Sequence, residues 1–270
     1  WPTWTVSTYF LFFINLIFFN FIMLAILFSS CEEEEIVNQS TVNARVQIIH
    51  NSADIAAQSV DVYLNNELLL DNFSFRTSTP FVDIPANEDI TISIAPSTSM
   101  SASQGIVSYN YLLEENKKYI IIASGHLSPV GYTPLKNFSL EVFDMGRENA
   151  NNASNTDLIV FHGSTDAPTV DVVETGVGAG TIVNNASYKD FTNYLELTTA
   201  NYTLEVRDES GETTVASYDA PLSNLNLMGG AGVVLASGFL NPSKNNNGDG
   251  FGLFVALPSG GDLVALPNSN

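Results

Sequence analysis

Two histidine–aspartate pairs are the residues of this chain best suited to do chemistry. Asp54 follows His50 at a spacing of four residues, and Asp166 follows His162 at the same spacing. An imidazole beside a carboxylate can serve in acid–base catalysis or bind a metal ion. A zinc site requires three or four ligands, so one such pair is too small for it. The alternative is structural: the histidine bonds a turn, and the aspartate caps that turn. We expect the structural role, with no metal and no cofactor.

The other motifs are weak. Residues 176–180 are rich in glycine, but no helix is expected after them, which favours a hairpin over a phosphate loop. Residues 245–250 offer side-chain oxygens without the acidic spacing of a calcium loop. The sequence contains no Gly-x-Ser-x-Gly and no His-Glu-x-x-His motif, and we interpret the protein as non-enzymatic. Five tyrosines could stack on sugars if they are exposed: Tyr109, Tyr111, Tyr132, Tyr188 and Tyr194.

The composition argues against a nucleic-acid partner. The 270 residues include 9 Lys and Arg against 29 Asp and Glu, which gives a formal net charge of −20. A surface of this sign repels phosphate backbones. The single cysteine, Cys31, can form neither an internal disulfide nor a structural zinc site.

Residues 1–30 predict a signal peptide. They contain no charged side chain, and residues 9–27 are apolar over a length sufficient to span a bilayer. The small residues Ser29 and Ser30 stand directly before Cys31. This arrangement resembles the lipobox of bacterial lipoproteins, which implies cleavage before the cysteine and lipid attachment to its sulfur. The alternative is an uncleaved membrane anchor with an incidental cysteine.

A run of acidic residues follows the cysteine: Glu32, Glu33, Glu34 and Glu35. The run resembles the surface-export signal of Bacteroidota lipoproteins, which implies a location in the bacterial outer membrane with the protein facing outward. The alternative is a solvated acidic spacer. In both cases residues 31–43 form a short flexible tether, lipidated at its first residue if the lipobox is used.

The rest of the chain contains the same unit twice. Each copy opens with an apolar strand that ends in histidine, and Val-Asp-Val follows at residues 60–62 and 170–172. Ala-Ser-Gly recurs at residues 123–125 and 236–238. We assign the first copy to residues 44–146, a polar linker to residues 147–156 and the second copy to residues 157–267. His126 of the first copy corresponds to Phe239 of the second, which indicates a packing position.

Both copies are predicted to consist of strands. Residues 91–94 and 202–207 alternate polar and apolar side chains, and the continuous apolar run at residues 119–123 fits either a central strand buried on both faces or a sandwich core. Strands recur with short polar turns and without a long amphipathic helix. We therefore predict an all-β fold with two tandem β-sandwich domains, immunoglobulin/prealbumin-like, after the N-terminal lipoprotein signal segment.

The repeated motif resembles domain-of-unknown-function family 4397. The second copy has the fuller form at residues 162–172, His-Gly-Ser-Thr-Asp-Ala-Pro-Thr-Val-Asp-Val. The first copy has Ile55 and Ala56 where Ala-Pro would stand, and two extra residues before the next strand. The resemblance implies an extracytoplasmic β domain, often in tandem and often on lipoproteins. It brings no catalytic residues.

These observations predict a non-enzymatic, lipid-anchored cell-surface protein. Its two sandwich domains would bind or adhere to an envelope protein or an extracellular polysaccharide. Exposed coplanar aromatic side chains would support the polysaccharide. Two alternatives remain open: a hydrolase with a site between the two domains, which requires a cleft with converging carboxylates or histidines, and a purely structural envelope spacer.

Overall fold

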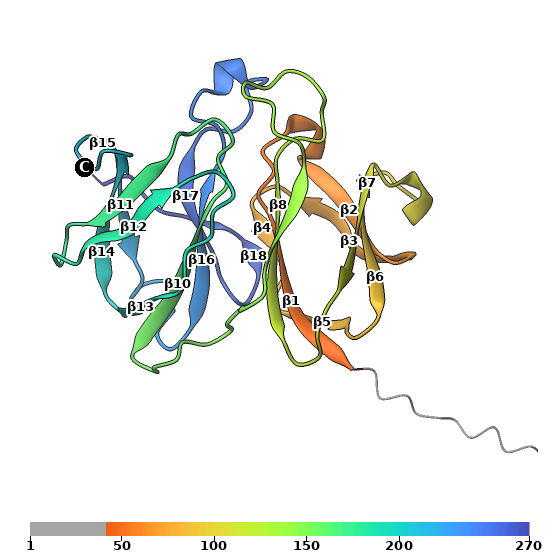
Figure 1. Cartoon of the computed structure of the whole chain (residues 1–270), viewed down its shortest axis with the longest axis horizontal. Coiled ribbons are helices and arrows are strands. Elements are labelled where there is room, and N and C mark those ends of the chain that lie inside the picture. The colour runs from red at the N-terminus through yellow and green to blue at the C-terminus, as the bar shows by residue number, and fades with distance from the viewer. Residues whose placement is uncertain (1–41, 270) are drawn as a thin grey trace, which may run out of the picture. The chain divides into compact units, whose positions relative to one another are not determined.

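The computed structural model describes residues 42–269, which form an almost entirely β structure (Figure 1). Short 3-10 turns interrupt the strands at η1 (Ile55–Ala57), η2 (Ala102–Gln104) and η3 (Pro242–Lys244). Within these residues, no helix has the length and apolar character needed to cross a membrane. The prediction of an all-β fold is confirmed.

The first repeat folds into two sheets, together called sandwich 1. Inner sheet 1 has six strands in the order β18-β4-β1-β8-β9, with β5 also paired to β1, and outer sheet 1 has four in the order β3-β2-β6-β7. The inner strands are β1 (Asn43–His50), β4 (Thr77–Ser78), β5 (Val82–Pro85), β8 (Lys118–Ser124), β9 (Ser139–Phe143) and β18 (Gly261–Asp262). The outer strands are β2 (Ser59–Leu64), β3 (Glu67–Ser74), β6 (Asp89–Pro96) and β7 (Val107–Leu112).

The second repeat forms sandwich 2 in the same way. Inner sheet 2 has five strands in the order β13-β10-β16-β17-β19, and outer sheet 2 has four in the order β12-β11-β14-β15. The inner strands are β10 (Asn155–His162), β13 (Leu195–Thr198), β16 (Ala231–Ser237), β17 (Gly252–Ala256) and β19 (Val264–Ala265). The outer strands are β11 (Val170–Glu174), β12 (Gly180–Ala186), β14 (Asn201–Asp208) and β15 (Thr214–Pro221).

The two sandwiches share one topology. Each inner sheet is built on a central parallel pair, β1 with β8 in sandwich 1 and β10 with β16 in sandwich 2, while the other pairings are antiparallel. In matching registers, His50 stands opposite Ala123 and His162 stands opposite Ala236. The main strands of the two copies read from the sequence therefore correspond, and the internal repeat is confirmed.

Each sandwich has its own apolar core between its inner and outer sheets. Alternate residues of the outer strands point inward, as do Val60, Val62, Ile92 and Ile94 in sandwich 1. The matching core of sandwich 2 includes Val206. This alternation follows from the period of two along a strand, and it places many of the polar side chains on the opposite face of each outer sheet.

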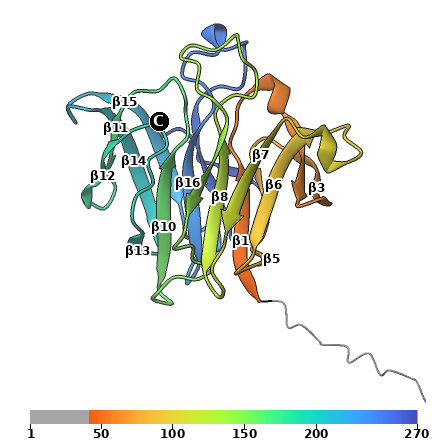
Figure 2. The same ribbon diagram turned by 45° about the vertical axis from the view of Figure 1, so that its right-hand side comes forward.

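A third apolar cluster joins the two sandwiches. It fills the space between the two inner sheets, which lie next to each other in the middle of the views in Figures 1 and 2. Its buried members are Ile49, Phe81, Ile120, Ile122, Phe143, Ile159, Phe161, Val233, Leu235, Ala256 and Leu263. The central inner strands are therefore buried on both faces, which explains the continuous apolar run at residues 119–123. We call this group the inter-sandwich core.

Chain segments also cross between the sandwiches. β18 of the second repeat pairs with β4 of inner sheet 1, so residues 261–262 belong to the sheet of the first repeat. β10 begins at Asn155, inside the segment predicted as a linker. The connection between the repeats is accordingly short, and charged side chains at its start bond to both sandwiches.

Candidate functional site

The histidine and aspartate of the first copy fix the turn after β1. The Nε2–H of His50 donates to the carbonyl of Ala57 at 2.7 Å. The Asp54 carboxylate accepts hydrogen bonds from the backbone N–H of Ala56, from both the N–H and the hydroxyl of Ser128, and from the hydroxyl of Tyr132. The side chains of His50 and Asp54 are fully buried, and their bonds go to different partners. They tie η1 to the loop between β8 and β9.

The second copy repeats this arrangement. The Nε2–H of His162 donates to the carbonyl of Pro168 at 3.0 Å. The Asp166 carboxylate accepts from the N–H groups of Leu240 and Asn241 and from the side-chain amide of Asn245. Asn241 corresponds to Ser128, so the same bond forms at the same place in both sandwiches. Repetition of the bonding pattern indicates that these side chains serve the fold of each copy.

The ionisation of these groups agrees with this bonding. Burial lowers the pKa of His50 to about 4, so its imidazole is neutral at pH 7. Burial by itself would raise the pKa of the Asp54 carboxyl, but hydrogen bonds from Tyr132, Ser128 and Ala56 bring it below its ordinary value. At neutral pH His50 is therefore an uncharged donor to the carbonyl of Ala57, and the Asp54 carboxylate is bonded to donors of the protein itself.

An aromatic stack lies between the two sandwiches beside these turns. The ring of His126 stacks on Tyr132 with centroids 3.9 Å apart, and Phe239 packs against both rings at 5.8 and 5.6 Å. His126 and Phe239 hold matching positions in the two repeats, so the repeats meet here through equivalent residues. The Nε2–H of His126 donates to the hydroxyl of Thr165, which ties this loop to the second repeat. Both His126 and Phe239 are buried, as their correspondence in the sequence indicates.

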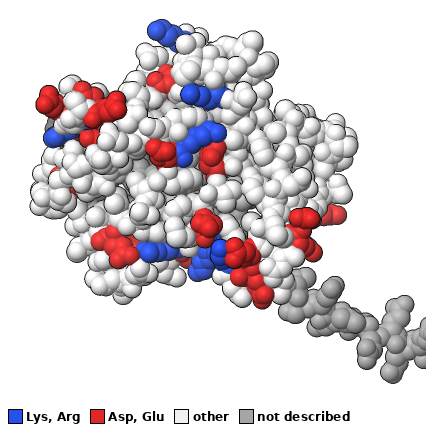
Figure 3. All heavy atoms as spheres, in the orientation of Figure 1, with Lys and Arg blue, Asp and Glu red and all other residues white. Residues whose placement is uncertain are grey.

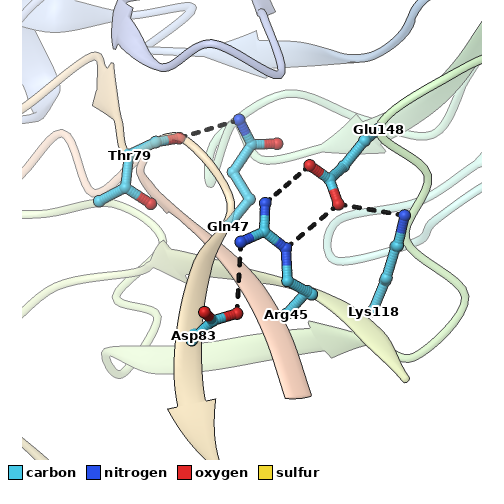
Figure 4. Close-up of polar contacts among 6 residues, drawn as sticks. All are labelled: Arg45, Gln47, Thr79, Asp83, Lys118 and Glu148. Carbon is cyan, nitrogen blue, oxygen red and sulfur yellow. Dashed lines mark hydrogen bonds and ion pairs between the residues drawn. The ribbon is translucent and has the colours of Figure 1, made fainter. Parts of the chain in front are cut away.

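The connection between the repeats is held by charged side chains. Glu148 accepts from Arg45 at 2.8 Å and from Lys118 at 3.1 Å, so it is bonded to sandwich 1 (Figure 4). The preceding residue, Arg147, bonds Asp157 of sandwich 2 at 2.6 Å. The hydrogen bond from Arg45 is the main cause that lowers the pKa of Glu148. Adjacent residues are thus attached to different sandwiches.

A buried amide adds a neutral link at the same interface. The Nε2 group of Gln47 donates to the carbonyl of Thr79 at 3.0 Å within sandwich 1 (Figure 4). It also donates to the carbonyl of Leu257 in the second repeat at 2.7 Å. Figure 3 shows that most Lys and Arg atoms on the visible face adjoin Asp or Glu atoms, with wide uncharged areas between these groups.

Comparison with known proteins identifies the family. The family described as domain of unknown function DUF4397 matches residues 44–173 and again residues 156–231. The chain belongs to the DUF4397 family. No curated protein matches the chain.

Several solved structures are distantly similar to this DUF4397 chain. One concerns alpha-glucan binding by a streptococcal virulence factor, with 10% identity, a TM-score of 0.23, and coverage of 71% of this chain and 92% of that chain. A family 26 carbohydrate-binding module from Eubacterium rectale in complex with maltoheptaose has 8% identity, a TM-score of 0.23, and coverage of 73% and 92%. Family 41 modules from streptococcal virulence factors have 9% identity and a TM-score of 0.22, with coverage of 71% and 92%. TM-scores this low carry no argument about the function of the DUF4397 chain.

The tyrosines considered for sugar stacking do not form an exposed platform. None of the aromatic side chains in residues 42–269 is exposed. All five tyrosine hydroxyls bond within the protein, to Phe138, Leu140, Asp54, Ser124 and Arg147. The alternation of β7 turns Tyr109 and Tyr111 toward the core. In this part of the DUF4397 chain the aromatic rings are thus buried or half-buried, and none is fully exposed.

The two weak loop motifs are also occupied by internal bonds. The carboxylate of Glu174 accepts the N–H groups of Gly176, Val177 and Ala179, so these amides are unavailable to a phosphate. In the loop at residues 245–250, the side-chain oxygen of Asn245 accepts from the N–H of Thr133. Across residues 42–269, no three His, Cys, Asp or Glu side chains are grouped so that they could hold a metal ion.

The residues proposed for lipid attachment and export lie outside the described residues. These are Cys31 and the acidic run Glu32, Glu33, Glu34 and Glu35. Sequence reasoning missed the side chains that join the two sandwiches, Arg45, Gln47, Arg147 and Glu148. A signal for them was present, because Arg147 and Glu148 are adjacent opposite charges in an otherwise uncharged connection.

Proposed function

We propose that this DUF4397 protein is a non-enzymatic, lipid-anchored cell-surface protein that presents two rigidly joined β-sandwiches to a binding partner. The observation that carries the proposal is the use of the family motif: its His and Asp side chains bond the turns of their own sandwiches in both copies. Side chains used in this way stabilise a scaffold and are not available for catalysis. The loops on that scaffold are then the parts that recognise a partner.

The inter-sandwich core supports this proposal over the hydrolase. A hydrolase site between the domains needs a cleft in which polar groups converge. That space is filled by apolar side chains, among them Phe161 and Leu235, both with no exposed surface. The same core gives a binding protein a fixed spacing between its two sandwiches, which lowers the entropic cost of engaging one partner with both.

The course of β1 supports presentation from a tether. The strand enters inner sheet 1 at Asn43 and reaches His50 at the opposite end of the sheet. The loops at residues 127–137 and 240–251 lie at that far end, away from the point where the preceding chain joins (Figure 1). Exposed apolar side chains occur there, namely Val130, Leu135 and Leu240.

The partner is an envelope protein or an extracellular polysaccharide, and the side-chain chemistry favours the protein. Sugar-binding faces typically include an exposed aromatic ring, and every aromatic ring in residues 42–269 is buried or half-buried. A purely structural spacer is the remaining alternative. It differs from the proposal in having no saturable partner.

Protease treatment of intact cells tests the location. Cells carry the wild type, a Cys31→Ala form, or a form in which Glu32, Glu33, Glu34 and Glu35 are replaced by Ala. We expect the wild type to be lipidated and digested from outside, and the Glu replacement to be lipidated but protected. A periplasmic marker protein that stays intact is the control for cell integrity. Protection of the wild type would contradict the surface location.

A further inference from the structure

In sandwich 2, the C-terminal segment closes one side of the sandwich. β19 pairs with β17 and forms the edge of inner sheet 2, and the N–H of Leu266 donates to the carbonyl of Leu253 at 2.9 Å. The segment then reaches the other sheet, where Asn268 pairs with Tyr218 of β15. Leu266 is buried in the core of sandwich 2. One segment therefore covers the edges of both sheets.

The matching side of sandwich 1 has no such segment among residues 42–269. Inner sheet 1 ends there at β9, and outer sheet 1 ends at β7. Two side chains of β7 reach toward β9 instead. The hydroxyl of Tyr109 donates to the carbonyl of Phe138 at 2.9 Å, and that of Tyr111 donates to the carbonyl of Leu140 at 3.4 Å. The second of these bonds is long for a hydroxyl donor.

The register shows that these are equivalent edges. Leu140 stands opposite Ala123 in sandwich 1, as Leu253 stands opposite Ala236 in sandwich 2. The carbonyl of Leu140, which accepts from Tyr111, thus corresponds to the carbonyl of Leu253, which accepts from a strand N–H in sandwich 2. Backbone groups that face outward recur at every second residue of an antiparallel edge strand. The N–H and C=O of Val142 therefore also point away from β8.

The side chains at the two edges differ in size. Tyr111 stands opposite Ile90, and the residue at the matching position of sandwich 2 is Ala220, opposite Tyr202. The small Ala220 leaves room in that core for Leu266. In sandwich 1 the half-buried ring of Tyr111 packs against the core instead. Tyr111 supplies an apolar contact, but it cannot supply the backbone bonds of a strand.

We propose that the β9 edge of sandwich 1 binds an extended polypeptide segment of a partner protein, which pairs with β9 as an added strand. An open edge strand is a template for this kind of pairing. The segment that closes sandwich 2 indicates the chemistry required: Val264 and Leu266 pack inward, and Ala265 between them is exposed. This inference rests on the proposed role as a binding protein, and it assigns a site and a ligand class to that role.

A peptide with the sequence of residues 262–269 is the probe. A fluorescently labelled form is titrated into the purified full chain in detergent, and anisotropy is measured. We expect saturable binding, which is lost when the peptide carries Asp in place of Val264 and Leu266. Tyr111→Ala should bind about tenfold more tightly, because the inward side chain of the peptide then has room. If neither the wild type nor Tyr111→Ala binds the apolar peptide more tightly than the Asp peptide, the proposal is overturned.

A matched pair of variants at Val142 locates the binding. Val142→Pro removes the outward N–H and blocks pairing at this edge, whereas Val142→Ala retains the N–H. We expect Val142→Pro to weaken peptide binding at least about tenfold relative to Val142→Ala. Thermal unfolding checks that both are folded. Equal affinity in two folded variants would place the peptide elsewhere and refute the proposal.

Amide hydrogen exchange in the wild type is the second readout, and it does not depend on the fold of a variant. Bound peptide should slow exchange at Leu140 and Val142, and unchanged exchange at saturation would contradict the added strand. These measurements use purified protein, so they do not depend on cellular location. A failure of peptide binding is therefore distinguishable from a failure of surface export.

Discussion

Asn51 and Gly163 occupy the same position in the two repeats, and the side chain of Asn51 fills the space that Gly163 leaves open. The Nδ2 group of Asn51 donates across the interface to the carbonyl of Ala236 at 3.3 Å. The N–H of Gly163 donates to the same carbonyl at 3.1 Å. The pair shows how a tandem repeat becomes asymmetric when its copies pack on each other, since the two residues cannot both have side chains here.

We predict that Gly163→Ala destabilises the protein by about 1–3 kcal/mol. A Cβ atom at this position would overlap Nδ2 of Asn51 and lie 2.9 Å from the carbonyl oxygen of Ala236. Urea unfolding measures the change. The double variant Asn51→Ala with Gly163→Ala should recover part of the loss, because the overlap with Asn51 is removed. Strict additivity of the two single changes would contradict this steric explanation.

The sequence was sufficient to predict the internal repeat and the strands, because both depend on local patterns. The apolar strand ending in His50 and His162 recurs with its Ser-x-Asp turn, and the period of two is visible at residues 91–94. The apolar run at residues 119–123 predicts either a strand buried on both faces or a sandwich core, and the structure shows the first. Local periodicity, however, cannot tell a core within one sandwich from a core between two.

The interface and the open edge could not be predicted from the sequence. The bond from Arg45 to Glu148 spans 103 residues, and the bond from Gln47 to Leu257 spans 210. Such contacts depend on how two finished sandwiches are placed, which no short pattern encodes. The pairing of β18 with β4 has the same origin. Sequence continuity assigns residues 261–262 to the second copy. Their strand pairing is with β4 of the first copy.

The two sandwiches should unfold as one cooperative unit, and Leu235 should be essential to it. This side chain is fully buried in the inter-sandwich core. We expect Leu235→Ala to reduce the free energy of unfolding by about 2–5 kcal/mol. The matched control is Leu240→Ala, at a side chain that is 49% exposed, with an expected change below about 0.5 kcal/mol. Scanning calorimetry checks both, and two well-separated transitions in the wild type would contradict a single unit.

The free energy of unfolding should decrease as the pH is lowered through a window set by His50. Burial lowers the pKa of this imidazole to about 4 in the folded protein, against 6.5 for the ordinary value. The contribution of the neutral histidine is complete above pH 6.5. It is lost as the pH falls toward 4, because the unfolded chain then binds a proton that the folded chain does not. The full loss amounts to about 3 kcal/mol.

The comparison with His50→Gln isolates this effect. Glutamine retains an N–H group to donate to Ala57 but does not titrate in this range. Unfolding free energies are measured for both proteins from pH 7 to pH 4, and the difference between the two curves is plotted against pH. We expect that difference to change through the window. A constant difference would contradict the lowered pKa of His50 in the folded protein.

The family-motif aspartates should contribute to stability to a similar extent in both copies. Asp54→Asn and Asp166→Asn each replace an acceptor oxygen by an NH2 group that faces backbone donors, at an expected cost of about 1–3 kcal/mol. Asp249→Asn is the control, because that exposed carboxylate accepts a single bond from Gln58. Urea unfolding measures all three. If the two motif variants instead retained full stability and lost partner binding, these aspartates would belong to a binding site and the scaffold role proposed for them would be wrong. If only the two motif variants lose stability and the Asp249→Asn control does not, the scaffold role is supported. A side chain that only contacts a ligand from the surface would not stabilise its own turn.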